Sequence, residues 1–265
     1  AHRRAQRRGA TKETTIEVSV DLDAPWCEAD LPSGAQGAWT GNVMTSTTLT
    51  ATVERTARIK TGISVLDRVL TELVRCAGIQ VVVHCEGDRH IDDHHTAEDV
   101  AITLGQCLHE ALGDKAGLAR MGCAEGAHAA ARCRAVLDLS NRAHFESDLS
   151  LDEEYVGGVD GEVVALAFGA DGADVGGSES SSSPCDAICG GVLSSEMLHH
   201  VFLSLTMELR ATVHLEVLED SGAPGHTLDI ALAASSAFGA ALASASKLDP
   251  RRHGVVASSK GTLSQ

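Results

Sequence analysis

The stretch HIDDHHTAEDV, at residues 90–100, contains three histidines and four carboxylates. If the end of this stretch forms the first turns of a helix, Glu98 lies one turn along the same face from His94 and also neighbours His95. Imidazole and carboxylate ligands without thiolates suit Mn²⁺ in particular. The alternative is a solvated helix N-terminus, where the helix dipole attracts carboxylates, but that gives no role to two adjacent histidines. The spacing therefore favours a metal site.

The hydrophobic pattern predicts the elements that would position this stretch. Apolar residues at helical spacing predict a helix over 63–78, a β-branched run predicts a strand over 79–88, and a second helix is expected over 99–113. The same pattern returns about 130 residues later, at 198–205, 211–220 and 225–243. This repeat predicts an α+β protein made of duplicated half-domains, each a β-sheet packed on helices.

The patterns divide the chain into four predicted segments. They are a basic N-terminal tail at 1–12, a first half-domain at 13–150 with an insertion at about 24–44, a Gly/Ser-rich insertion at 151–192 and a second half-domain at 193–265. The site at residues 90–100 would then open the second helix of the first half-domain.

Composition narrows the class of partner. The net charge of −16 argues against a nucleic-acid-binding surface, which needs clustered Lys and Arg, and no apolar run approaches the length of a membrane span. Scattered cysteines without a paired framework indicate a reducing compartment, which we expect to be the cytoplasm. The basic, acid-free start AHRRAQRRGATK has two interpretations, a frayed terminus or the remnant of an organelle-targeting segment such as a plastid transit peptide.

Several motifs occur in one order along the chain: TKETTIEV, TGISVLD, GDRHIDDHHTAEDVAITLGQCLHEALGDKAGLARMG, LDLSNR and DPRRHGVVASSKGTL. Together they closely resemble the imidazoleglycerol-phosphate dehydratase family over nearly the whole chain outside 24–44 and 157–190. The resemblance implies a duplicated fold like domain 2 of ribosomal protein S5. It implies conversion of D-erythro-imidazole-glycerol phosphate to imidazole-acetol phosphate and water in histidine biosynthesis. It also implies two Mn²⁺ ions per active site and a homo-oligomeric shell of twenty-four subunits that share active sites.

The resemblance also implies roles for individual residues. Two carboxylates, Glu13 and Glu98, are expected to move protons. The expected metal ligands come from both halves and are His94, His95, Glu98, His200, His226 and Asp229. The expected phosphate-binding residues are Arg120, Arg142, Ser259 and Lys260, because arginine makes bidentate contacts with phosphate and lysine supplies a point charge.

The second half departs from the family pattern. Arg68 stands where the family has a histidine, Gly225 takes the place of the first histidine in the second HHxxE motif, and Asp229 replaces its glutamate. A helix lysine expected to bind phosphate is Ala233. Two hypotheses follow. The chain is a working dehydratase with a divergent second metal site, or it is a noncatalytic relative that acts as a structural partner of an active paralogue.

Overall fold

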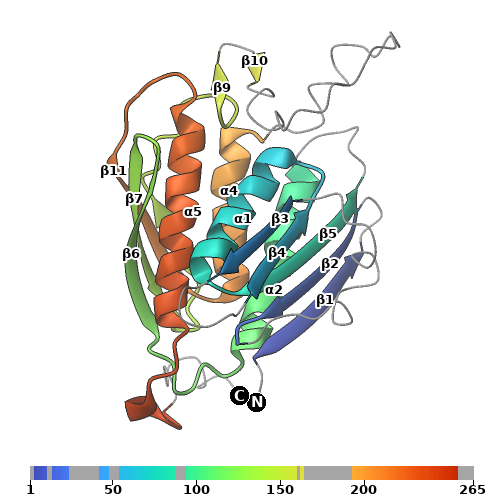
Figure 1. Cartoon of the computed structure of the whole chain (residues 1–265), viewed down its shortest axis with the longest axis vertical. Helices are drawn as coiled ribbons and strands as arrows, with labels where there is room; N and C mark the ends of the chain where they lie inside the picture. The colour runs from blue at the N-terminus through green and yellow to red at the C-terminus, as the bar shows by residue number, and fades with distance from the viewer. Residues whose placement is uncertain are drawn as a thin grey trace.

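Two main β-sheets enclose two layers of helices in the computed structural model (Figure 1). The structure describes residues 3–10, 14–23, 42–47, 54–87, 94–159, 162–163 and 193–255. Helices α1 (Ser64–Ala77) and α2 (His94–Leu112) cover the first sheet, and α4 (Ser195–Leu209) and α5 (His226–Ala245) cover the second. The layers meet where α1 packs on α5 and α2 packs on α4.

The first sheet has the strand order β1-β2-β5-β4-β3. Its strands are β1 (Arg4–Ala10), β2 (Thr14–Asp21), β3 (Asn42–Thr47), β4 (Glu54–Lys60) and β5 (Gln80–Gly87). Strands β4 and β5 are parallel because α1 connects them, and every other neighbouring pair in this sheet is antiparallel.

The second sheet repeats this topology in the order β6-β7-β11-β8. Its strands are β6 (Met121–His128), β7 (Ala131–Asp138), β8 (His144–Ser147) and β11 (Thr212–Glu219). Again β8 and β11 are parallel and joined by a segment containing a helix, α4, while the other pairs are antiparallel. A short hairpin, β9 (Gly158–Val159) with β10 (Glu162–Val163), and the 3-10 helix η4 (Pro250–Arg252) complete the described elements. The predicted α+β duplication is confirmed.

The predicted boundaries of the halves are wrong. Strands β6 to β8 lie within the predicted first half-domain, 13–150, but their hydrogen bonds place them in the second sheet. The predicted tail at 1–12 contains β1, which is hydrogen-bonded along its length to β2. Of the predicted insertions, 24–41 and 164–192 lie outside the described residues, while β3 begins inside the first and β9 and β10 lie inside the second. Strand pairing, not the Gly/Ser-rich stretch, divides the halves.

Contrary to the expectation that no apolar run approaches the length of a membrane span, helix α5 is long and apolar enough to do so by length and composition. In the fold it packs against β6 and β7 on one side and α1 on the other, so that most of its residues are buried inside the protein. Its hydropathy is therefore accounted for by the protein core.

Glycines allow the helix layers to approach closely. A Cβ added to Gly105 of α2 would lie 2.7 Å from both Glu208 Cβ and Leu205 O of α4. A Cβ on Gly239 of α5 would collide with the backbone carbonyl of Leu73 in α1. The Gly105 contact fixes the spacing of α2 against α4, and hence of the side chains at their N-terminal turns. The Gly239 contact fixes the spacing of α5 against α1.

Candidate metal centre

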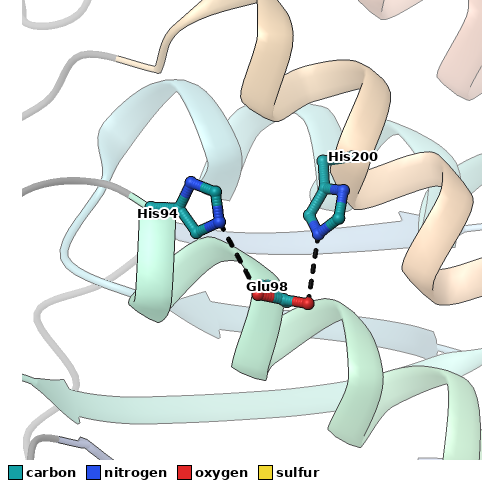
Figure 2. A group of neighbouring side chains, drawn as sticks. All are labelled: His94, Glu98 and His200. Carbon is teal, nitrogen blue, oxygen red and sulfur yellow. Dashed lines mark ion pairs between the residues drawn. The ribbon is translucent and has the colours of Figure 1, made fainter.

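Two helices from different halves bring the candidate ligands together. His94 is the first residue of α2, and Glu98 lies one turn later on the same face. His200 lies in the second turn of α4, a helix whose start is fixed by Ser194, because the hydroxyl of Ser194 accepts a hydrogen bond from the backbone N–H of Met197. Since α2 and α4 pack together, His200 faces the first turns of α2 (Figure 2).

Glu98 lies between the two imidazoles, as Figure 2 shows. One of its carboxylate oxygens is 3.1 Å from Nε2 of His200, and the other is 3.8 Å from Nε2 of His94. The two imidazole rings are 5.6 Å apart between centroids. The side chains of Glu98 and His200 are each about one-third exposed and that of His94 is about half exposed, so the group can be reached from solvent.

The donor set fits a divalent cation. One ligand atom from each of His94, Glu98 and His200 lies within 4.8 Å of the others, and among the described residues this is the one such group of three or more. A neutral imidazole offers a lone pair and a carboxylate offers negative charge, a combination that suits Mn, Fe or Zn. This places His94, Glu98 and His200 together, as their predicted common role requires.

Known proteins are similar to this chain over nearly its whole length. The family model for imidazoleglycerol-phosphate dehydratase matches residues 61–170. A dehydratase of that name from Neurospora crassa is 34% identical over 96% of this chain and 93% of its own length. The chain belongs to the imidazoleglycerol-phosphate dehydratase family. A relative of the same name from Cereibacter sphaeroides is 35% identical over 98% of this chain and all of its own length.

Solved structures share the fold. The crystal structure of the Pyrococcus furiosus dehydratase aligns with a TM-score of 0.57 at 23% identity, covering 94% of this chain and 98% of that chain. The Staphylococcus aureus dehydratase aligns with the same TM-score at 19% identity, covering 91% and 97%. At this identity the likeness supports the fold alone, and it agrees with the duplicated α+β arrangement described above.

The remaining predicted metal ligands of this family member do not join the cluster. The ring of His95 lies at the edge of the His94 ring, with centroids 5.9 Å apart, but His95 is outside the group of three. His226 is buried, and its Nε2 is 2.9 Å from a carboxylate oxygen of Asp152. Asp229 accepts from Nδ1 of His128 at 3.0 Å. The second-half motif therefore has partners of its own within the chain.

Two of the predicted phosphate ligands, Arg120 and Arg142, lie at the other end of the subunit. Arg120 donates two hydrogen bonds to the carboxylate of Asp138, 2.7 and 2.9 Å long, which raise the pKa of its guanidinium. Its backbone N–H donates to Ala245 at the end of α5, a helix about 30 Å long. The start of α5 lies near the start of α4, because Tyr155 bridges to Ser194 and Gly157 donates to Thr227. Arg120 is thus about a helix length from the cluster.

Arg142 occupies the same remote end, since its carbonyl accepts from Thr212 at the start of β11, beside Arg120's partner strand β7. Glu13, Ser259 and Lys260 lie outside the described residues. Within one subunit, therefore, the described residues do not bring the predicted phosphate-binding arginines to the metal cluster.

Sequence reasoning missed the structural role of Lys115. Its side chain is fully buried, and Nζ donates to the carbonyls of Leu209 and Arg210 at the end of α4, at 3.0 and 3.2 Å. A cation is favoured there because the helix dipole is negative at its C-terminus. Burial lowers the pKa of the ammonium from 10.5 to about 8. Lys115 follows α2, so it ties the far end of α2 to the far end of α4. Nothing in the spacing of LGDK signals this contact.

Proposed function

We propose that this protein is an imidazoleglycerol-phosphate dehydratase, converting D-erythro-imidazole-glycerol phosphate to imidazole-acetol phosphate and water in histidine biosynthesis. Membership of the family over almost the full chain supports the reaction. The observation that carries the proposal for this chain is the convergence of His94, Glu98 and His200 from two helices. A noncatalytic scaffold would need no such convergence of metal-ligating groups.

The reaction removes one proton from carbon and one hydroxide, and it leaves the phosphate unchanged. His94 and His200 would hold a divalent ion, which we propose is Mn²⁺, through their Nε2 atoms. Bound there, the ion would act as a Lewis acid toward the substrate imidazole and stabilise negative charge on it.

Glu98 has two oxygens with different neighbours, one 3.1 Å from His200 and one 3.8 Å from His94. A carboxylate so placed can hold a cation with one oxygen and take up or return a proton with the other. Glu13 is proposed as the second proton-transfer group. Because its neighbour Thr14 donates to Asp99 of α2 at 2.7 Å, the start of β2 is tied to the helix that carries Glu98.

The distance of Arg120 from the cluster bears on assembly. A substrate whose imidazole meets His94 and whose phosphate meets Arg120 cannot bridge about 30 Å within one subunit. We therefore propose that sites are completed between subunits, with the cluster of one chain facing the arginines of another. The homo-oligomeric shell of twenty-four subunits expected for this family would satisfy that requirement.

The test compares two adjacent histidines on α4. His200→Ala should lower turnover of imidazole-glycerol phosphate with added Mn²⁺ by about 100-fold or more, since positioned acid–base and metal groups contribute at least that much. His199→Ala is the matched control, because His199 points toward β8, where its Nδ1 is 3.2 Å from the hydroxyl of Ser147. It should retain wild-type turnover. Absence of product from folded wild-type protein at every Mn²⁺ concentration would refute the proposed function.

A further inference from the structure

The duplication places a twin of the metal cluster in the second pair of helices. Helices α2 and α5 correspond in the two halves, as do α1 and α4, and α2 packs on α4 in the same way that α5 packs on α1. The offset that aligns α2 with α5 carries His94 to Gly225 and Glu98 to Asp229. The corresponding offset between α4 and α1 carries His200 to Arg68. The twin of the cluster is therefore Gly225, Asp229 and Arg68.

These three residues do not suit a divalent ion. Gly225 has no side chain, and Arg68 carries a permanent positive charge and no lone pair for coordination. The one remaining donor, the carboxylate of Asp229, is engaged by the imidazole of His128 at 3.0 Å. His128 ends β6, so this contact joins the second sheet to the start of α5.

The neighbouring His226 is also unsuited to coordination. Its Nδ1 lies 2.9 Å from the carbonyl oxygen of Ala223, which can only accept a hydrogen bond. Its Nε2 lies 2.9 Å from Asp152 and 3.7 Å from Asp220, both carboxylates. Both ring nitrogens therefore already face hydrogen-bond acceptors within the chain. The side chain is also only 8% exposed, which leaves little access for an ion.

Side chains of the same chain accept hydrogen bonds from the first residues of α5. The backbone N–H of Gly225 donates to Glu153 at 2.6 Å, and the hydroxyl of Thr227 donates to the same carboxylate. Glu153 therefore satisfies donors that a helix N-terminus leaves without intrahelical partners. Together with His226 it anchors the segment before β9 to α5.

We infer that the chain holds one divalent ion per subunit, at His94, Glu98 and His200, and that the equivalent position in the second half is a metal-free polar junction. This rests on the proposed metal role of the first cluster. It departs from the two ions per active site that the family resemblance implies.

The test is metal content by elemental mass spectrometry of the assembled protein, after dialysis with Mn²⁺ and removal of loosely held ions. The wild type should contain one ion per chain, and His94→Ala should lose it. Asp229→Ala and His226→Ala should each keep one ion per chain, and the His226 variant should melt at a lower temperature because its buried hydrogen bonds are lost.

The alternatives give distinct counts. Two ions in the wild type, with one lost in Asp229→Ala, would overturn the inference while leaving the proposed function standing. No ion in folded wild-type protein would overturn both the inference and the metal role proposed for the first cluster. Circular dichroism of each variant establishes that a lost ion reflects a lost ligand and not an unfolded chain.

Discussion

Replacing Lys115 by methionine should change how stability depends on pH. The Lys115 ammonium is fully buried against two backbone carbonyls, and its pKa is about 8 instead of the usual 10.5. Between these values the unfolded chain binds a proton that the folded chain does not, so the free energy of unfolding rises with pH. From pH 7 to pH 10 this linkage contributes about 2.5 kcal/mol, at about 1.36 kcal/mol per unit of pKa.

The comparison with Lys115→Met isolates this contribution. Buried thiols such as Cys85 and Cys107, whose pKa burial raises to about 12, lower the stability of both proteins above pH 9, because they ionise more readily in the unfolded chain. Urea unfolding of both proteins at pH 7 and pH 10, at one protein concentration, gives the difference directly. The wild type should gain about 2.5 kcal/mol relative to the variant. Parallel pH profiles would show that the Lys115 ammonium is not desolvated, and would refute its role as a buried clamp on α4.

Three further predictions follow from the contacts of the core and the site. Burial raises the pKa of Asp67 to about 6, so on going from pH 7 to pH 4 the folded chain binds a proton before the unfolded chain does. Over this range the free energy of unfolding of the wild type should rise by about 2 kcal/mol relative to that of Asp67→Asn, as measured by urea unfolding at the two pH values. Gly105→Ala should cost about 1–3 kcal/mol and weaken Mn²⁺ binding, since separating α2 from α4 moves His200 from Glu98; unchanged affinity in equilibrium dialysis would contradict this. Mixed assemblies of inactive His94→Ala and inactive Arg120→Ala subunits should recover part of the turnover if each active site is formed by two subunits. If each site lies within one subunit, the mixture should have no turnover.

The hydrophobic pattern of the sequence does not predict strands β1 and β6, and the reason is the same for both. The positions of β6 that face α5 include Gly122 and Gly126, where an added Cβ would collide with backbone carbonyls of the helix. In β1 the inward positions include Ala5 and Gly9, and a Cβ added to Gly9 would lie 3.3 Å from the hydroxyl oxygen of Thr103 in α2. A strand that a helix approaches this closely cannot carry large apolar side chains, so it lacks the alternation that predicts strands. Strands β5 and β11, which do carry larger apolar side chains, agree with the sequence prediction to within a residue at each end.

The part of the candidate site that lies within one helix could be predicted from the sequence. The pairing of His94 with Glu98 follows from helix geometry alone, and the structure has it. The position of His200 depends on the packing of α4 against α2, which no local pattern encodes, and it was expected only through the family resemblance. His226 and Asp229 were assigned by the same alignment, but their contacts with Asp152 and His128 depend on segments distant in the sequence.

The two halves differ at positions where a substitution has little effect on the stability of the core. His94 is about half exposed at the first turn of α2, so the corresponding position in α5 can become Gly225 without opening a cavity in the core. Gly239 lies where α5 crosses α1, and any side chain there would collide with the backbone of Leu73. Ligand residues at helix starts are therefore free to change while residues at helix crossings are not. A duplicated protein can thus change the side chains at the start of one helix and keep the architecture that positions their counterparts in the other half.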